Sequence, residues 1–284
     1  MTPTTHAYGP GPDQFLELTL PLPVQEPDGA AALPGHSAGD GPAPVVVVVH
    51  GGFWRAARGI ELARPLAADL AARGWAAVAV EYRRVGTGAG GGGGWPETLD
   101  DVAAALDALP DLPGSARLDL TDVTVVGHSA GGQLAAWAAG RGRLPAGAPG
   151  ASPRVRVAAA VLQAGVLDLT RADEQHMGQD AVAQFLGGRA DDVPERYATA
   201  DPVRLLPTGA AVLCVHGTED TSVPPEQSDR YAAAATAAGD TVEVVLVPGD
   251  HMMVIDLAGE AWRRVLDWLS ARRTATADRI TLDS

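Results

Sequence analysis

Hydrophobic and polar positions follow two rhythms along the chain, and these predict strands and helices in turn. Residues 45–50 begin with an unbroken aliphatic run, typical of a strand buried on both faces. Residues 97–109 place Val102, Leu106 and Leu109 on one face at helical spacing. The same patterns predict strands at 76–81, 123–126, 157–162, 210–216 and 242–247, and helices at 65–73, 130–139, 225–238 and 258–272. Such alternation indicates an α/β fold with a mostly parallel central sheet and helices on both faces.

Three segments depart from this alternation. Residues 15–20 place apolar and polar side chains in turn, which predicts an antiparallel edge strand. Residues 25–44 are rich in Pro, Gly and Ala and are predicted to form a loop. Residues 168–206 are too many for a simple connection, so we expect a small cap or lid there.

Length and composition narrow the class of protein. The 284 residues show no internal repeat and no linker, so we expect one domain over 1–284. Its core is expected at about 44–272, after an N-terminal strand and loop at 1–43. A formal net charge of −14 disfavours a nucleic-acid partner, because phosphate contacts need a basic surface. The single cysteine, Cys214, excludes an internal disulfide framework and a multi-cysteine metal site, and no metal or cofactor is expected.

The location of the protein is predicted from the start of the chain and from its apolar runs. The first residues lack the basic start and apolar core of a secretory signal. The longest aliphatic run, 45–49, is far shorter than the roughly 20 residues that span a bilayer. We therefore expect a cytoplasmic protein with a small-molecule substrate and no membrane partner, while the oligomeric state stays open.

The sharpest chemical signal is Gly127-His128-Ser129-Ala130-Gly131, which matches G-x-S-x-G between a predicted strand and a predicted helix. A serine on such a turn needs small residues two positions away on each side, and both are glycine. The Ala130 N–H would lie at a helix N-terminus, where it can bind an oxyanion. The alternative is a glycine-rich helix start in which the serine serves only as a cap.

A second glycine-containing turn, His50-Gly51-Gly52-Phe53-Trp54, follows the aliphatic strand. Its glycines allow backbone N–H groups to approach a substrate oxygen closely. We expect the oxyanion hole to form from Gly51, Gly52 and Phe53 together with Ala130, with the N–H groups of Gly52 and Phe53 foremost. His50 is expected to orient the turn through hydrogen bonds, and Trp54 either packs in the core or contacts substrate.

At these two motifs the chain resembles the α/β-hydrolase superfamily, over roughly residues 44–272. HGGFW together with GHSAGG is similar to the kynurenine formamidase and small carboxylesterase branch. The hormone-sensitive-lipase branch usually has HGGG, and here Phe53 replaces its third glycine. The resemblance implies a serine hydrolase that cleaves a small carboxylic ester or an N-formyl amide through an acyl-enzyme on Ser129.

The fold's chain order of serine, acid and histidine selects the base. Only His176, His216 and His251 follow Ser129. His251 comes just after the last predicted strand and before the last helix, which matches the family's catalytic histidine. His176 falls in the expected cap, and His216, at a strand end, is interpreted as structural.

The catalytic acid should follow the predicted strand at 210–216, the one before the strand that leads to His251. Residues 216–224 read HGTEDTSVP and resemble the family's HGxxDxxVP turn, which gives the acid role to Asp220. Asp168 also follows a strand and is the main rival. Glu219 is expected to be solvated, and Asp250 adjoins the histidine too closely in sequence to orient it.

Substrate contacts are predicted at Trp54, Trp95 and His128, although the tryptophans could equally belong to the core. Residues 86–91 fit G-x-G-x-x-G by letter but do not lead directly into a helix, so a dinucleotide site is not expected. The glycine-rich stretch 86–94 is either a mobile loop over the site or a linker. Two alternatives to a hydrolase remain: an acyltransferase of the same fold, and a non-catalytic ligand-binding homologue.

Overall fold

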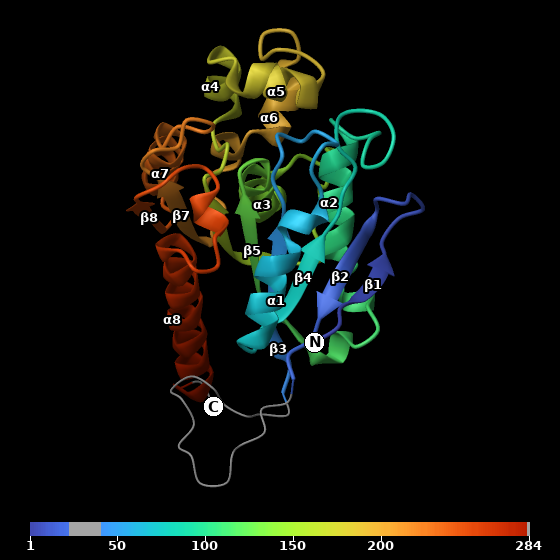
Figure 1. The fold of residues 1–284 in the computed structure, drawn as a ribbon, viewed down its shortest axis with the longest axis vertical. Helices are drawn as coiled ribbons and strands as arrows, with labels where there is room; N and C mark the ends of the chain where they lie inside the picture. The colour runs from blue at the N-terminus through green and yellow to red at the C-terminus, as the bar shows by residue number, and fades with distance from the viewer. Residues whose placement is uncertain (23–40, 283–284) are drawn as a thin grey trace.

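The computed structural model describes residues 1–22 and 41–282, with side chains of the last helix described as far as Thr274. Within these residues eight strands form one sheet in the order β1-β2-β4-β3-β5-β6-β7-β8 (Figure 1). The strands are β1 (Thr4–Ala7), β2 (Phe15–Thr19), β3 (Ala43–Val49), β4 (Ala76–Val80), β5 (Leu118–His128), β6 (Val157–Gln163), β7 (Ala211–Gly217) and β8 (Val242–Val247).

Strand direction divides the sheet into two parts. The pairs β1–β2 and β2–β4 are antiparallel, and all pairs from β4 to β8 are parallel. In register, Val47 of β3 lies between Val78 of β4 and Val125 of β5. The predicted mostly parallel sheet is confirmed, but residues 15–20 are not its edge. The edge strand on this side of the sheet is β1, whose side chains are mostly exposed and therefore carry no apolar pattern.

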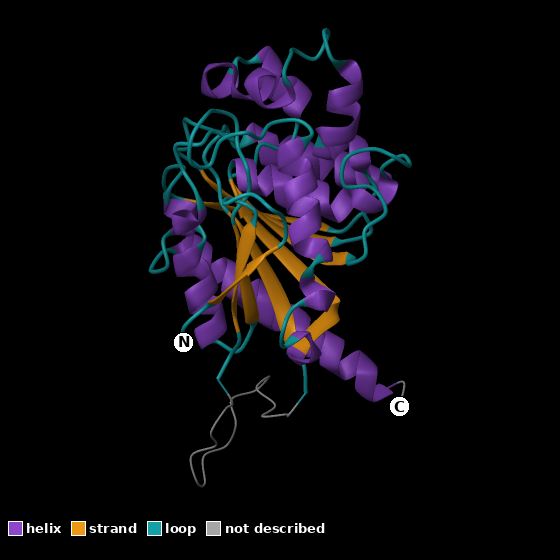
Figure 2. Ribbon diagram, turned by 90° about the vertical axis from the view of Figure 1, so that its right-hand side faces the viewer, coloured by secondary structure: helices purple, strands orange, loops and turns teal. Residues whose placement is uncertain are grey.

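Helices cover both faces of the sheet, as predicted (Figure 2). They are α1 (Arg64–Ala72), α2 (Glu97–Asp107), α3 (Ala130–Gly140), α4 (Leu169–Glu174), α5 (Met177–Leu186), α6 (Pro194–Ala200), α7 (Glu226–Ala238) and α8 (Glu260–Leu282). Val46 and Val48 of β3 face α1 and α8, whereas Val45, Val47 and Val49 face α2 and α3. Alternate residues of one aliphatic strand thus serve two cores, which explains its unbroken apolar run.

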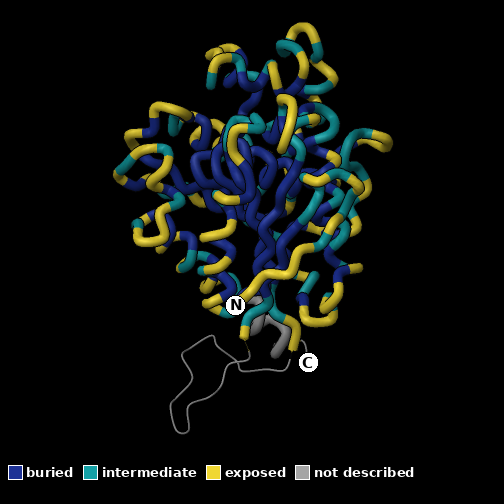
Figure 3. Tube along the Cα trace, turned by 45° about the vertical axis from the view of Figure 1, so that its right-hand side comes forward, coloured by how far each residue is buried: buried dark blue, intermediate teal, exposed yellow. Residues whose placement is uncertain are grey.

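Figure 3 shows the buried residues gathered along the central strands, with exposed residues on the outer helices and loops. The predicted strand 123–126 is the buried end of the longer β5. Short 3₁₀ helices occur at Ile60–Leu62, Leu109–Asp111, Ser115–Arg117, Arg141–Arg143, Pro202–Leu205 and Met253–Ile255. Most of the predicted loop 25–44 lies outside the described residues. No helix in the described part of the chain is both long and apolar enough to cross a membrane.

Residues 169–205 leave the sheet and form α4, α5, α6 and the 3₁₀ helix Pro202–Leu205, which we call the cap. The cap stands beyond the carboxyl ends of the parallel strands (Figure 1). The turns that follow β3, β5, β7 and β8 emerge at this same end of the sheet. Parallel strands thus bring together residues from four distant parts of the sequence, beneath the cap.

Candidate active site

Ser129 lies on the turn between β5 and α3 with φ 56° and ψ −120°, a conformation that is costly for a residue with a side chain. The flanking glycines make this turn possible. A Cβ atom at Gly127 would overlap the carbonyl oxygen of Gly131, and one at Gly131 would overlap the carbonyl oxygen of Val49. The turn has the geometry that the G-x-S-x-G spacing predicts.

The Ser129 hydroxyl is buried and has no hydrogen-bond partner among the described residues. The residue as a whole is only 1% exposed. Its backbone is nevertheless well held, since the N–H donates to the Gln163 carbonyl oxygen at 2.8 Å. A buried hydroxyl without a partner is uncommon in proteins and calls for a functional explanation.

Asp220 and His251 meet although 31 residues separate them, with Nδ1 of His251 2.6 Å from Oδ2 of Asp220. The other Asp220 oxygen accepts the N–H groups of Ser222 and Val223, each at 2.9 Å. Although burial raises the pKa of Asp220, hydrogen bonds from His216, His251 and the Val223 N–H outweigh it and hold that pKa far below its ordinary value. The carboxylate therefore stays ionised and fixes the proton of His251 on Nδ1, which leaves Nε2 as an acceptor.

The rival acids have other partners. Asp168 caps α4 by accepting the Arg171 N–H and also forms an ion pair with Arg230 of α7 at 2.7 Å. Asp250 accepts the N–H groups of the next turn, and Glu219 is exposed. Of these candidates, only Asp220 contacts His251.

The other two histidines also lie away from the position of the base. The His176 side chain is 66% exposed and pairs with Asp180 of the cap. His216 is fully buried, and its Nε2 lies 2.8 Å from the Val223 carbonyl oxygen and 3.3 Å from Asp220 Oδ2. This second contact to Asp220 was not predicted, although the i, i+4 spacing of His216 and Asp220 is visible in the sequence.

The turn after β3 lies against the nucleophile. A Cβ atom at Gly51 would lie 3.0 Å from the Ser129 Cβ and 2.7 Å from the His128 carbonyl oxygen. The φ angles of Gly52, Phe53 and Trp54 are 120°, 50° and 53°, all in the left-handed region.

Several backbone N–H groups near this turn are free to donate. Within residues 1–22 and 41–282, those of Gly51, Gly52, Phe53, Trp54 and Ala130 have no recorded acceptor, and this set contains all four predicted oxyanion donors. Free donors around a serine are what an oxyanion hole requires.

His50 is hydrogen-bonded to this turn, as predicted. Its Nδ1 lies 2.8 Å from the Gly51 carbonyl oxygen, its Nε2 lies 3.0 Å from Glu81, and its ring stacks on Tyr82 at 4.3 Å. Burial raises the pKa of Glu81, but hydrogen bonding to His50 and the nearby Arg84 charge outweigh it and lower that pKa to about 2. A charged Glu81 thus anchors His50 and the turn above it.

The three predicted substrate contacts take different positions. Trp54 is fully buried, donates from Nε1 to Gln133 at 3.0 Å and stacks on Phe185 at 4.7 Å. These contacts are those of a packing residue, and its substrate contact stays a prediction. Trp95 is half-buried, and the Arg196 guanidinium lies 4.7 Å over its ring.

His128 is buried and contacts His251, the predicted base. Its Nε2 donates to the His251 carbonyl oxygen at 2.9 Å, and the two rings lie 4.7 Å apart. Burial and the adjacent His251 lower the pKa of His128 to about 3, so the ring is neutral. This contact places the backbone of His251 beside the residue that precedes Ser129.

The glycine-rich stretch 86–94 is not an open linker. Its backbone folds back on Arg84, which follows β4 in the chain. The Arg84 N–H donates to the Gly90 carbonyl oxygen, and the Gly93 N–H donates to the Arg84 carbonyl oxygen, both at 2.8 Å. The Gly90 N–H also donates to Asp13 at 2.9 Å. These bonds fold the stretch into a compact turn beside the strands.

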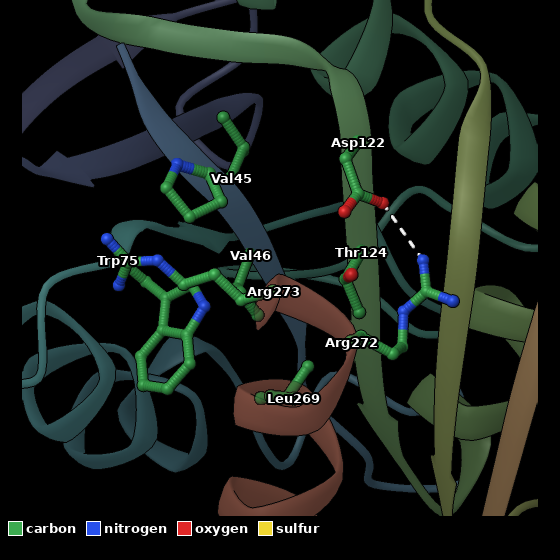
Figure 4. Close-up of a pocket in the computed structure, with 9 residues that line it drawn as sticks. Val45, Val46, Trp75, Asp122, Thr124, Leu269, Arg272 and Arg273 are labelled. Carbon is green, nitrogen blue, oxygen red and sulfur yellow. Dashed lines mark hydrogen bonds and ion pairs between the residues drawn. The ribbon is translucent and has the colours of Figure 1, made fainter. Parts of the chain in front are cut away.

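A separate small pocket lies between the start of β3, the middle of β5 and α8 (Figure 4). Its lining includes Trp75, Leu269 and Arg273, and an ion pair joins Arg272 to Asp122 at 3.0 Å. Thr124 in this pocket precedes Ser129 by five residues of extended chain, a span of roughly 16 Å. The pocket therefore lies at the opposite end of the strands from the candidate active site.

The parallel sheet, the serine turn and the Asp220–His251 pair define an α/β-hydrolase. The chain belongs to the BD-FAE family, whose model matches residues 33–234. It is 31% identical over 265 residues to esterase LipQ of Mycobacterium tuberculosis (strain ATCC 25618 / H37Rv), which covers 91% of this chain. The chain spans 58% of the length of LipQ.

Two solved structures share the fold. Esterase B from Lactobacillus rhamnosis (HN001) superposes with a TM-score of 0.77 at 20% identity, covering 100% of this chain and 89% of its own. The butyrate-bound thermophilic esterase Est2 from Thermogutta terrifontis has a TM-score of 0.69 at 22% identity, covering 99% of this chain and 94% of its own. The predicted α/β-hydrolase fold is confirmed, and the kynurenine formamidase branch remains a prediction.

Proposed function

We propose that the protein is a carboxylic ester hydrolase that works through an acyl-enzyme on Ser129. The observation that carries the proposal is the 2.6 Å contact between His251 and Asp220, joined through the hydrogen bond from His128 to the turn whose Ser129 hydroxyl is buried and unpartnered. Membership of the BD-FAE family and the similarity to LipQ, an esterase, support the same reaction class.

The reaction follows from the roles of these residues. His251 Nε2 takes the Ser129 proton as Oγ attacks the ester carbonyl, and the N–H groups of Gly52, Phe53 and Ala130 stabilise the resulting oxyanion. The carbon–oxygen bond to the leaving alcohol then breaks, and that alcohol takes the proton from His251. Water attacks the acyl-enzyme with His251 again as base, and the acid and free Ser129 are released. Asp220 holds the imidazole in the required tautomer throughout.

The proposed substrate is an ester with a small acyl group. Ser129 is only 1% exposed, and the cap stands beyond the strand ends from which the turns of the site emerge. Est2, which shares the fold, is a butyrate-bound esterase. An N-formyl amide is the competing substrate, because HGGFW and GHSAGG resemble the formamidase branch.

The first experiment compares hydrolysis of p-nitrophenyl acetate and of N-formylkynurenine by the wild type and by Ser129→Ala. We expect ester cleavage, with kcat lowered by more than about a thousandfold in the variant. Ser270→Ala, on the exposed surface of α8, is the matched control and should match the wild type.

Each other outcome has a distinct meaning. Near-normal turnover in Ser129→Ala would overturn the proposed nucleophile. Fast deformylation that exceeds ester cleavage would make the protein a formamidase. No labelling of Ser129 by a fluorophosphonate probe would indicate a non-catalytic binding homologue. Preferential transfer to an added alcohol would indicate an acyltransferase.

A further inference from the structure

We infer that Arg55 is a positioning residue that couples the cap to the oxyanion turn, so that a correctly seated cap is needed for a correctly shaped oxyanion hole. This inference rests on the proposed function. We define the oxyanion turn as residues 51–55.

Arg55 reaches from the oxyanion turn into the first turn of α5. Its Nη2 donates to the carbonyl oxygens of Gly178 at 2.7 Å and Gln179 at 3.0 Å. Its Nε donates to the Gln184 side chain at 3.0 Å, and Gln184 in turn donates to the Gln179 carbonyl oxygen at 2.9 Å. One guanidinium thus makes three hydrogen bonds to the cap, which its planar fork of donors permits.

The segment that receives Arg55 has an unusual backbone. Gly178, Gln179 and Asp180 have φ angles of 59°, 60° and 58°, so the start of α5 is not a right-handed helix. Carbonyl groups in a regular α-helix bond to N–H groups four residues later. The left-handed turn instead presents two carbonyl oxygens to Arg55. Two non-glycine residues in this conformation need support from their surroundings.

The residues just before Arg55 contact the same helix. A Cβ atom at Gly178 would lie 2.7 Å from the Phe53 ring, so the ring lies directly against this glycine. The Trp54 ring stacks on Phe185 with an angle of 5° between the planes. Three successive residues of the oxyanion turn, Phe53, Trp54 and Arg55, therefore contact α5.

These contacts bear on catalysis through the backbone. Phe53 and Trp54 both have positive φ angles, and the Arg55 N–H closes the turn by donating to the Gly52 carbonyl oxygen at 3.0 Å. The direction of the free N–H groups of Gly52 and Phe53 depends on the backbone angles of residues 51–53, and contacts that shift the turn would change them. An oxyanion donor acts mainly in the transition state, so a shifted turn should lower kcat more than it raises KM.

The test compares Arg55→Ala and Arg55→Lys with Arg171→Ala. Arg171 also links the cap to the rest of the chain, since it joins α4 to Glu226 of α7 at 3.3 Å, but it does not contact the oxyanion turn. We expect kcat for p-nitrophenyl acetate to fall about tenfold to a hundredfold in Arg55→Ala, with KM within about threefold. In Arg55→Lys kcat should fall less than in Arg55→Ala, because lysine keeps the positive charge. It should still fall, because lysine lacks the planar fork of donors. Arg171→Ala should keep kcat within about twofold of wild type.

Amide hydrogen exchange provides a readout that does not depend on activity. In Arg55→Ala, exchange should become faster both in peptides covering 51–55 and in those covering 176–186. In Arg171→Ala, exchange over 51–55 should stay at the wild-type rate. If the wild type cleaves no ester, the proposed function fails, while this measurement still decides the coupling.

Three results would overturn the inference. The first is an unchanged kcat in Arg55→Ala. The second is faster exchange confined to the cap, with 51–55 unaffected. The third is an equal effect of Arg171→Ala on 51–55, which would reflect general loosening of the cap. Because Arg55→Lys retains the charge and most of the side-chain volume, it provides the same comparison should Arg55→Ala fail to fold.

Discussion

The two halves of the candidate site are held in different ways. The serine turn and the Asp220–His251 pair are supported by the sheet and by the turns next to it: Gly131 packs under the Val49 carbonyl oxygen, and Asp220 is held by N–H groups of its own loop. The turn at residues 51–55 is held from the core by His50 and Gln133, and it also contacts the cap, more than 120 residues later in the chain. The proposed nucleophile and base are therefore held by the core alone, whereas the proposed oxyanion turn is held by both the core and the cap.

The largest effect should come from the core half of the site. Asp220→Asn should lower kcat by about a thousandfold or more, because the amide cannot stabilise an imidazolium or fix the same His251 tautomer. Steady-state kinetics with p-nitrophenyl acetate measures the loss. Asp168→Asn is the matched control, since Asp168 pairs with Arg230 and not with His251. A thousandfold loss of kcat in Asp168→Asn and none in Asp220→Asn would contradict the prediction and give the acid role to Asp168.

A second effect should come from the contact between the oxyanion turn and the cap. Trp54→Ala removes a fully buried ring and its stack on Phe185, and we expect a loss of about 3–5 kcal/mol in the free energy of unfolding. Urea denaturation measures this loss. Trp268→Ala, at a half-buried position of α8, should cost clearly less. Similar losses in the two variants would show that the cap contact adds no special stability.

The smallest effect per unit of the variable changed should be the pH dependence contributed by His128. Its pKa is lowered from 6.5 to about 3 in the folded protein, so between these values the unfolded chain binds more protons. His128 therefore makes stability rise with pH over this window, by at most about 1.4 kcal/mol per pH unit. His128→Gln should flatten the dependence of unfolding free energy on pH between 4 and 6. A slope equal to that of wild type would mean that His128 titrates normally.

Much of the fold could be predicted because its signals are local. The aliphatic run of β3 is continuous because both of its faces are buried, and the glycines at positions 127 and 131 are required by the turn that they flank. The hydrophobic pattern does not predict strand β1, because its four residues are mostly exposed and leave no apolar pattern. Trp54 was ambiguous because an aromatic residue after a strand has the same appearance in sequence whether it lines a pocket or packs in a core.

By itself, the sequence determined the α/β alternation, the serine turn and the order of candidate acids and bases, because each depends on neighbouring residues or on a short spacing. Only the tertiary structure decided that Asp220, and not Asp168, contacts His251, that His216 shares the Asp220 carboxylate, and that Arg55 reaches into the cap. These contacts join residues far apart in the chain, and only the packing of strands, turns and cap brings such residues within hydrogen-bond distance.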